Sequence, residues 1–66
     1  MTEVKIGQYW RRLNGHIVKI TDERSFLGIK EVLLTPIKKG EGRKSWKSKK
    51  AVKYELTFIP ERYLKR

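Results

Sequence analysis

Nearly half of the cations in this chain lie in one short segment. Residues 38–53 hold eight of the 17 lysines and arginines but one of the seven acids, Glu41, and so carry +7 of the net charge of +10. The cations are Lys38, Lys39, Arg43, Lys44, Lys47, Lys49, Lys50 and Lys53, and Trp46 lies among them. We call residues 38–53 the basic segment. Such a combination offers point charges to phosphates and a flat ring to a base or sugar.

The lysine bias predicts contact with a phosphate backbone more than reading of base edges, and therefore binding that is sensitive to salt and broad in sequence. The expected contact residues are Lys38, Lys39, Arg43, Lys44, Trp46, Lys47, Lys49, Lys50 and Lys53, with Arg11 and Arg12 as an extension. Arg11 and Arg12 point to opposite faces of a strand, so they cannot form one patch together. Two alternatives stay open: the charges can form a solvated loop only, and Trp46 can pack onto the core rather than stack on a ligand.

Signals for catalysis and metal binding are weak. His16 is the single histidine, and neither an orienting acid nor a nucleophile is indicated beside it. The chain has no cysteine, and the glycines at 40 and 42 lack the other residues of a phosphate-binding loop. We therefore expect a protein that is not an enzyme and has no metal or cofactor.

The elements that would position the basic segment are mainly strands. Asn14-Gly15 predicts a β-hairpin, with strands near residues 7–13 and 16–22. Residues 22–28 look like a polar turn, with room for a single helical turn, and residues 29–37 like a third strand that Pro36 limits. The basic segment then forms a loop or hairpin at about residues 38–50, because Gly40 and Gly42 favour a turn.

The last long element is predicted from strict alternation. Over residues 51–59, Val52, Tyr54, Leu56 and Phe58 fall on one face of a strand. Pro60 ends this strand, and residues 60–64 suit a short helical turn. The whole chain, residues 1–66, is predicted to be one mostly β domain: a small barrel or strongly bent antiparallel sheet of about five strands.

The order of these elements resembles small SH3-like β-barrel domains. The matching features are the opening Gly7-Gln8-Tyr9-Trp10, the Asn14-Gly15 hairpin, the alternating last strand and the closing turn at residues 59–64. The resemblance implies a binding module, since such barrels include DNA-coating, ribosomal, Tudor-like and peptide-binding proteins, and short proteins of this kind occur in phages. The peptide groove of true SH3 domains is not expected, because the corresponding loop here is basic rather than acidic.

These observations predict a small protein that binds nucleic acid, double-stranded DNA ahead of RNA, in a regulatory or architectural role such as transcription regulation. A cysteine-free chain with no apolar run of membrane-spanning length suits the cytoplasm, at the nucleoid if DNA is the ligand. Two other partners fit the same charge. One is an acidic protein, which a phage-type inhibitor or adaptor would bind, and the other is ribosomal RNA. A membrane surface is not expected, because no basic amphipathic helix is evident.

Overall fold

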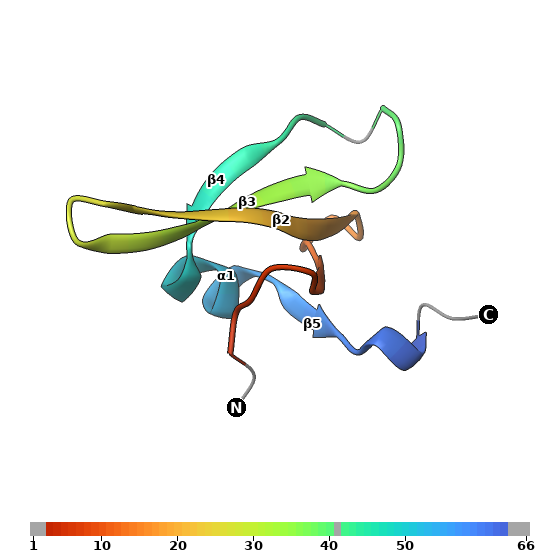
Figure 1. Cartoon of the computed structure of the whole chain (residues 1–66). Helices are drawn as coiled ribbons and strands as arrows, with labels where there is room; N and C mark the ends of the chain where they lie inside the picture. The colour runs from red at the N-terminus through yellow and green to blue at the C-terminus, as the bar shows by residue number, and fades with distance from the viewer. Residues whose placement is uncertain (1–2, 41, 64–66) are drawn as a thin grey trace.

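Five antiparallel strands, one short α-helix and one 3-10 helix make up the described part of the protein. The computed structural model describes residues 3–40 and 42–63. The elements are β1 (Tyr9–Arg11), β2 (Ile17–Phe26), β3 (Ile29–Pro36), β4 (Ser45–Ser48), α1 (Lys49–Glu55), β5 (Thr57–Ile59) and the 3-10 helix η1 (Glu61–Tyr63). The strands form one sheet in the order β4-β3-β2-β1-β5, curled into a half-barrel (Figure 1). The predicted mostly β, bent five-stranded architecture is confirmed, and it is compatible with an SH3-like fold.

The first two hairpins differ in how well the sequence predicts them. The turn at Asn14-Gly15 joins β1 to β2 as expected, with Gly15 at a φ of 90°. The polar turn predicted at residues 22–28 is wrong over most of its length, because β2 continues to Phe26. Phe26 pairs directly with Ile29, so only Leu27 and Gly28 form the turn into β3.

A bulge in β2 bends the sheet. The register of the β2–β3 ladder shifts between Ile20 and Asp22, which leaves Thr21 as an extra residue. A bulge of this kind increases the local twist and bends the strand. The Thr21 hydroxyl lies 2.7 Å from that of Thr35 across the ladder, so the bulge is tied to β3.

The core lies on the inner face of the bent sheet. Val18 and Ile20 of β2 and Val32 and Leu34 of β3 point to this face with a period of two and are fully buried. The inner face is covered by Val4 from the N-terminal segment, by Trp10 and by two residues from the region of α1, Val52 and Leu56. Trp10 meets Phe58 edge to face, with ring centroids 5.5 Å apart.

The strand predicted over residues 51–59 is wrong. Residues 49–55 are α1, and only Thr57–Ile59 form a strand, β5. Val52 and Leu56 are both buried because four residues span about one helical turn, whereas Tyr54, predicted to share their face, is 83% exposed. The predicted turn after Pro60 is present as η1, and Leu64 lies outside the described residues.

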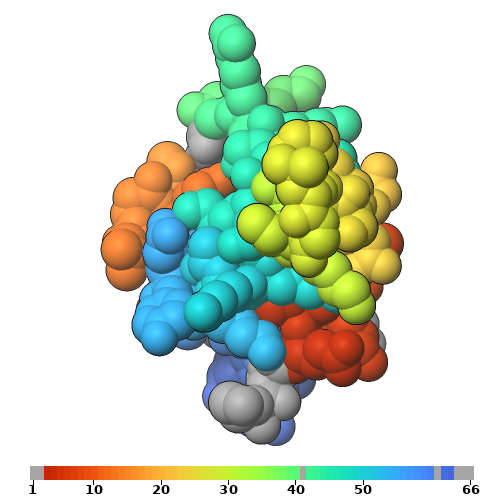
Figure 2. All heavy atoms as spheres, turned by 90° about the vertical axis from the view of Figure 1, so that its left-hand side faces the viewer, coloured from red at the N-terminus to blue at the C-terminus, as the bar shows by residue number. Residues whose placement is uncertain are grey.

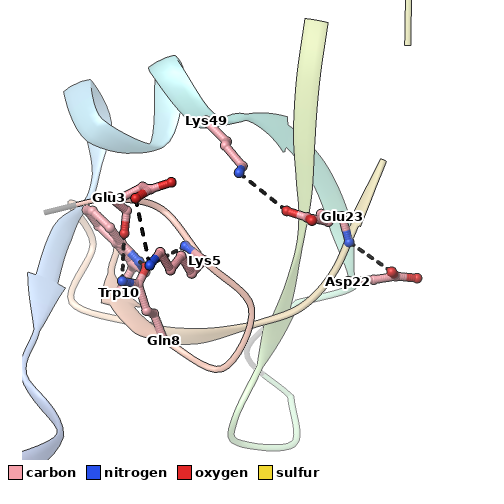
Figure 3. A network of polar contacts seen from close by, with 7 residues as sticks. All are labelled: Glu3, Lys5, Gln8, Trp10, Asp22, Glu23 and Lys49. Atoms are coloured by element: carbon pink, nitrogen blue, oxygen red, sulfur yellow. Dashed lines mark hydrogen bonds and ion pairs between the residues drawn. The ribbon is translucent and has the colours of Figure 1, made fainter. Parts of the chain in front are cut away.

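The side chain of Gln8 holds the N-terminal segment against the core (Figure 3). Its Oε1 accepts hydrogen bonds from the backbone N–H of Lys5 at 2.8 Å and from Nε1 of Trp10 at 3.1 Å. Its amide nitrogen donates to the backbone carbonyl of Glu3 at 2.7 Å. One side chain thereby fixes the loop that brings Val4 onto the sheet.

Candidate nucleic-acid interface

The basic segment is divided among three structural environments. Residues 37–44 connect β3 to β4, residues 45–48 are β4 itself, and α1 begins at Lys49 directly after β4. β4 is an edge strand of the sheet, and the connecting loop and the helix lie at its two ends (Figure 1). The segment thus includes the β3–β4 connection, the edge strand and the helix, which the prediction of a loop or hairpin at about residues 38–50 did not include.

The first group of cations is at the loop end of β4. The backbone N–H of Ile37 donates to the carbonyl of Ile17 at 3.3 Å, which holds the start of the loop beside the β1–β2 hairpin. A guanidinium N–H of Arg12 donates to the hydroxyl of Ser45 at 3.3 Å, which brings Arg12 to the same end. We call this group the loop-end cluster: Arg12, Lys38, Lys39, Arg43 and Lys44.

The loop-end cluster is available for binding. Its four members in the β3–β4 loop are exposed, and Arg12 is half-buried. None of the five makes an ion pair with another described residue. Like charges held in one loop repel each other, and an anionic ligand would relieve that repulsion.

The second group is on α1. Lys50, Lys53 and Tyr54 are exposed, and their spacing of three and four residues places them on one face of the helix. We call them the helix cluster. Tyr54, which the predicted strand places on one face with Val52 and Leu56, is instead an aromatic ring among cations at the surface. The signal that identifies it is Ser48, whose hydroxyl accepts from the backbone N–H of Ala51 at 3.2 Å and caps the helix.

Two lysines of the basic segment already have acidic partners. Lys47 of β4 lies 2.7 Å from Glu55 at the end of α1, and Lys49 lies 3.3 Å from Glu23 of β2 (Figure 3). The two pairs join α1 to the sheet near both ends of the helix. The side chains of Lys47 and Lys49 are 25% and 24% exposed, and both are paired, so they are less available to a ligand than the exposed lysines of the segment.

Trp46 lies outside the core but is not freely exposed. It pairs with Leu33 on the outer face of the sheet, opposite to the buried Val32 and Leu34. The guanidinium of Arg24 stands 4.2 Å from the centre of the Trp46 ring, and its Nε donates to Glu31 at 2.8 Å. One face of the indole is therefore covered by a cation that is itself held in place, so the ring is not open to stack on a base there.

The two arginines of the first hairpin separate, as their adjacent positions predict. Arg12 belongs to the loop-end cluster, whereas Arg11 is exposed on the outer face of β1 beside Tyr9 and Lys19. The ammonium group of Lys19 lies 5.5 Å from the ring centre of Tyr9. His16 follows the turn, and its backbone N–H donates to the side chain of Asn14 at 2.9 Å.

Within residues 3–40 and 42–63, no three His, Cys, Asp or Glu side chains group as metal ligands would. No helix in these ranges combines the length and apolar character that crossing a membrane requires. Comparison with known proteins gives no match to a family, to a curated protein or to a solved structure. The function must therefore be argued from the site itself.

Proposed function

We propose that this protein is a non-catalytic nucleic-acid-binding protein, with double-stranded DNA as the favoured ligand. The observation that carries the proposal is the placement of exposed cations, without ion pairs to other described residues, at both ends of the edge strand β4. Such an arrangement suits a long polyanion better than a small anion, because the charges are spread along a line. The ligand would lie along β4, from the loop-end cluster to the helix cluster.

The dimensions of β4 fit a nucleic-acid backbone. From Lys44 to Ser48, the last residue of β4, the chain advances four residues, or about 13 Å at the rise of an extended strand. A strand of duplex DNA carries a phosphate every 3.4 Å along the axis, so this length spans about four nucleotides. The outer edge of β4 also carries backbone N–H groups, which donate to phosphates in many protein–DNA complexes.

The aromatic residues favour a duplex over a single strand. Binding of single strands relies on open aromatic faces on which successive bases stack. One face of Trp46 is covered by Arg24 and Tyr9 is approached by Lys19, whereas the ring of Tyr54 is 83% exposed. A site with many phosphate contacts and one such ring binds without strong sequence preference, which suits an architectural or regulatory role.

The test is a titration of labelled duplex DNA over a series of salt concentrations, with single-stranded DNA and duplex RNA in parallel. We expect the logarithm of the binding constant to fall linearly with the logarithm of salt, with a slope of about −0.9 for each phosphate contacted. The variant Lys44→Gln removes one cation of the loop-end cluster and should reduce the slope by about 0.9. Lys30→Gln removes an exposed cation near the β2–β3 turn and should leave the slope unchanged.

Three results would contradict the proposal: no binding to any of the three nucleic acids, binding indifferent to salt, or equal effects of the two variants. Tighter binding to RNA than to DNA would support nucleic-acid binding but would make RNA, rather than DNA, the favoured ligand. Retention of an acidic protein after nuclease treatment, together with no binding to purified nucleic acid, would favour the protein-docking alternative.

A further inference from the structure

The β2–β3 hairpin extends beyond both of its neighbours. β1 pairs with β2 only as far as Lys19, and β4 pairs with β3 only as far as Glu31. Among the described residues, the outer edge of β2 is therefore without a ladder partner from Asp22 to Phe26, and that of β3 at Ile29 and Lys30. The end of the hairpin projects from the sheet as a two-stranded arm, seen at the left of Figure 1 and facing the viewer in yellow in Figure 2. We call residues 22–31 the arm. Toward its tip, its strand edges have no ladder partner in the described residues, and such edges are available to pair with another chain.

The tip of the arm is apolar and exposed. Phe26 is 56%, Leu27 86% and Ile29 55% exposed, so three large hydrophobic side chains surround one two-residue turn. Leu27 also has a φ of 52°, a conformation that favours Gly, Asn or Asp. With Gly28 at a φ of 80°, both turn residues have a positive φ, and two-residue hairpin turns of this kind strongly prefer Asn-Gly or Asp-Gly. Leucine at this position is unfavourable for the fold, and a strained, exposed apolar residue suggests a binding role.

The charge of the arm differs from that of the rest of the molecule. The arm contains two cations and three acids, a net charge of −1, which leaves +11 on the other residues. A net negative arm is a poor ligand for phosphates, so it does not extend the proposed nucleic-acid interface. Two of its acids are paired, Glu31 with Arg24 and Glu23 with Lys49, so the arm lacks the excess of cations found in the basic segment. Two copies of a chain with a charge of +10 therefore repel each other less when they approach through their arms than through their basic segments.

We propose that the arm is a self-association surface whose occupant is the arm of a second copy of this chain. Two identical arms related by a two-fold axis at their tips bring Phe26, Leu27 and Ile29 of both copies together, and the open edges of β2 are self-complementary where they overlap near Phe26. The contact leaves the loop-end cluster and the helix cluster of each copy free. A dimer of this kind would place two basic surfaces on one nucleic acid. Once one surface has bound, the effective concentration of the other at the same nucleic acid rises.

The dimer should be weak and should respond to salt in an unusual direction. The arm has ten residues, fewer than the roughly 20–30 that each partner contributes to a standard interface, so we expect dissociation in the micromolar to millimolar range. Added salt screens the repulsion between two highly positive chains, so self-association should strengthen as salt rises. Binding to nucleic acid should weaken over the same range, so the two proposals can fail separately.

The experiment is sedimentation equilibrium of the full chain without nucleic acid, from micromolar to millimolar concentration and at low and high salt. The test variant is Leu27→Asn, which removes the exposed leucine and creates an Asn-Gly turn, so it should fold at least as stably as the wild type. The matched control is Leu13→Asn, because Leu13 is 91% exposed at the turn of the other hairpin. We expect Leu27→Asn to weaken the dimer at least about tenfold, since a two-fold interface loses the side chain twice.

Thermal unfolding of the three proteins verifies that each is folded before sedimentation is interpreted. Self-association of the wild type and of Leu13→Asn, lost in Leu27→Asn, supports the proposal. A wild-type chain that stays monomeric at the highest concentration and salt overturns it, and assigns the arm to some other partner. Equal self-association of all three proteins overturns it as well, because the contact would then not use the tip.

Discussion

At the scale of single residues, one amide side chain organises the N-terminal part of the molecule. Gln8 bonds to the backbone at two positions of the N-terminal segment and to the indole of Trp10, which is 3% exposed. A buried indole N–H without an acceptor is costly, so Gln8 is the residue that allows Trp10 to be in the core. Hydrophobic patterning alone gives no reason for a glutamine at this position.

Replacing Gln8 therefore tests a polar contact rather than a hydrophobic one. Gln8→Leu removes the acceptor and should lower the free energy of unfolding by about 1–3 kcal/mol, measured by urea denaturation followed by tryptophan fluorescence. Gln8→Glu keeps the oxygen that accepts from Trp10 and Lys5 but loses the donor to the Glu3 carbonyl. It should cost less than Gln8→Leu, and an equal cost would show that the acceptor is not what matters.

At the scale of elements, α1 decides where the functional side chains point. In the strand predicted over residues 51–59, Tyr54 would lie beside Val52 in the core, whereas in the helix it faces solvent between Lys50 and Lys53. The helix thus supplies an exposed aromatic residue that the strand would have buried. The observed helix and the predicted strand therefore differ in the loss of stability that they predict for a substitution of Tyr54, whereas both predict a loss for a substitution of Val52.

Paired alanine substitutions distinguish the helix from the strand. Val52→Ala should lower the free energy of unfolding by about 2 kcal/mol, because it removes fully buried methyl groups. Tyr54→Ala should change it by no more than about 0.5 kcal/mol, because the side chain is largely exposed. Tyr54→Ala should nevertheless weaken binding to DNA. A large loss of stability from both variants would contradict the helix.

These elements also show what the sequence can and cannot predict. The Asn14-Gly15 hairpin and β3 were predictable because turn chemistry and β-branched runs act locally. The helix was not predictable, because the spacing of Val52 and Leu56 fits both the period of a strand and one turn of a helix. The exposure of Tyr54 distinguishes the two, and it is known only from the structure. Ser48 with the lysines, Ala51 and Glu55 after it is a helix signal that the alternation concealed.

Other features depend on contacts between distant parts of the chain. The position of Trp46 is set by Arg24, which lies 22 residues earlier and reaches it only after β2, β3 and β4 have paired. The division of the lysines into paired and free ones depends likewise on Glu23 and Glu55 meeting Lys49 and Lys47 in space. The basic segment was visible in the sequence, but which of its charges are available was not.

At the scale of the whole molecule, the question is whether ligands respond to net charge or to the placement of charge. A protein with a net charge of +10 attracts any polyanion at long range, whatever the arrangement of its cations. The structure favours the placement of charge, because some cations of the basic segment are paired with acids and others are not. Lys47 and Lys49 hold α1 to the sheet, whereas Lys50 and Lys53 face solvent.

Two double variants with equal charge separate these possibilities. Lys50→Gln/Lys53→Gln should reduce the salt slope of duplex binding by up to about 1.8, corresponding to two phosphates, with little effect on stability. Lys47→Gln/Lys49→Gln removes the same charge but breaks two partly exposed ion pairs. It should lower the free energy of unfolding by about 0–1 kcal/mol for each pair and reduce the slope less.

The comparison is decisive because both variants have the same net charge and lose lysines from the same segment. If binding followed net charge alone, their affinities and salt slopes would be equal, and the proposed interface along β4 would be wrong. A larger effect from Lys47→Gln/Lys49→Gln, with the fold intact by circular dichroism, would show that these ion pairs open to admit the ligand. The expected order, with Lys50 and Lys53 dominant, would mean that the short helix, absent from the sequence-based prediction, determines which lysines bind.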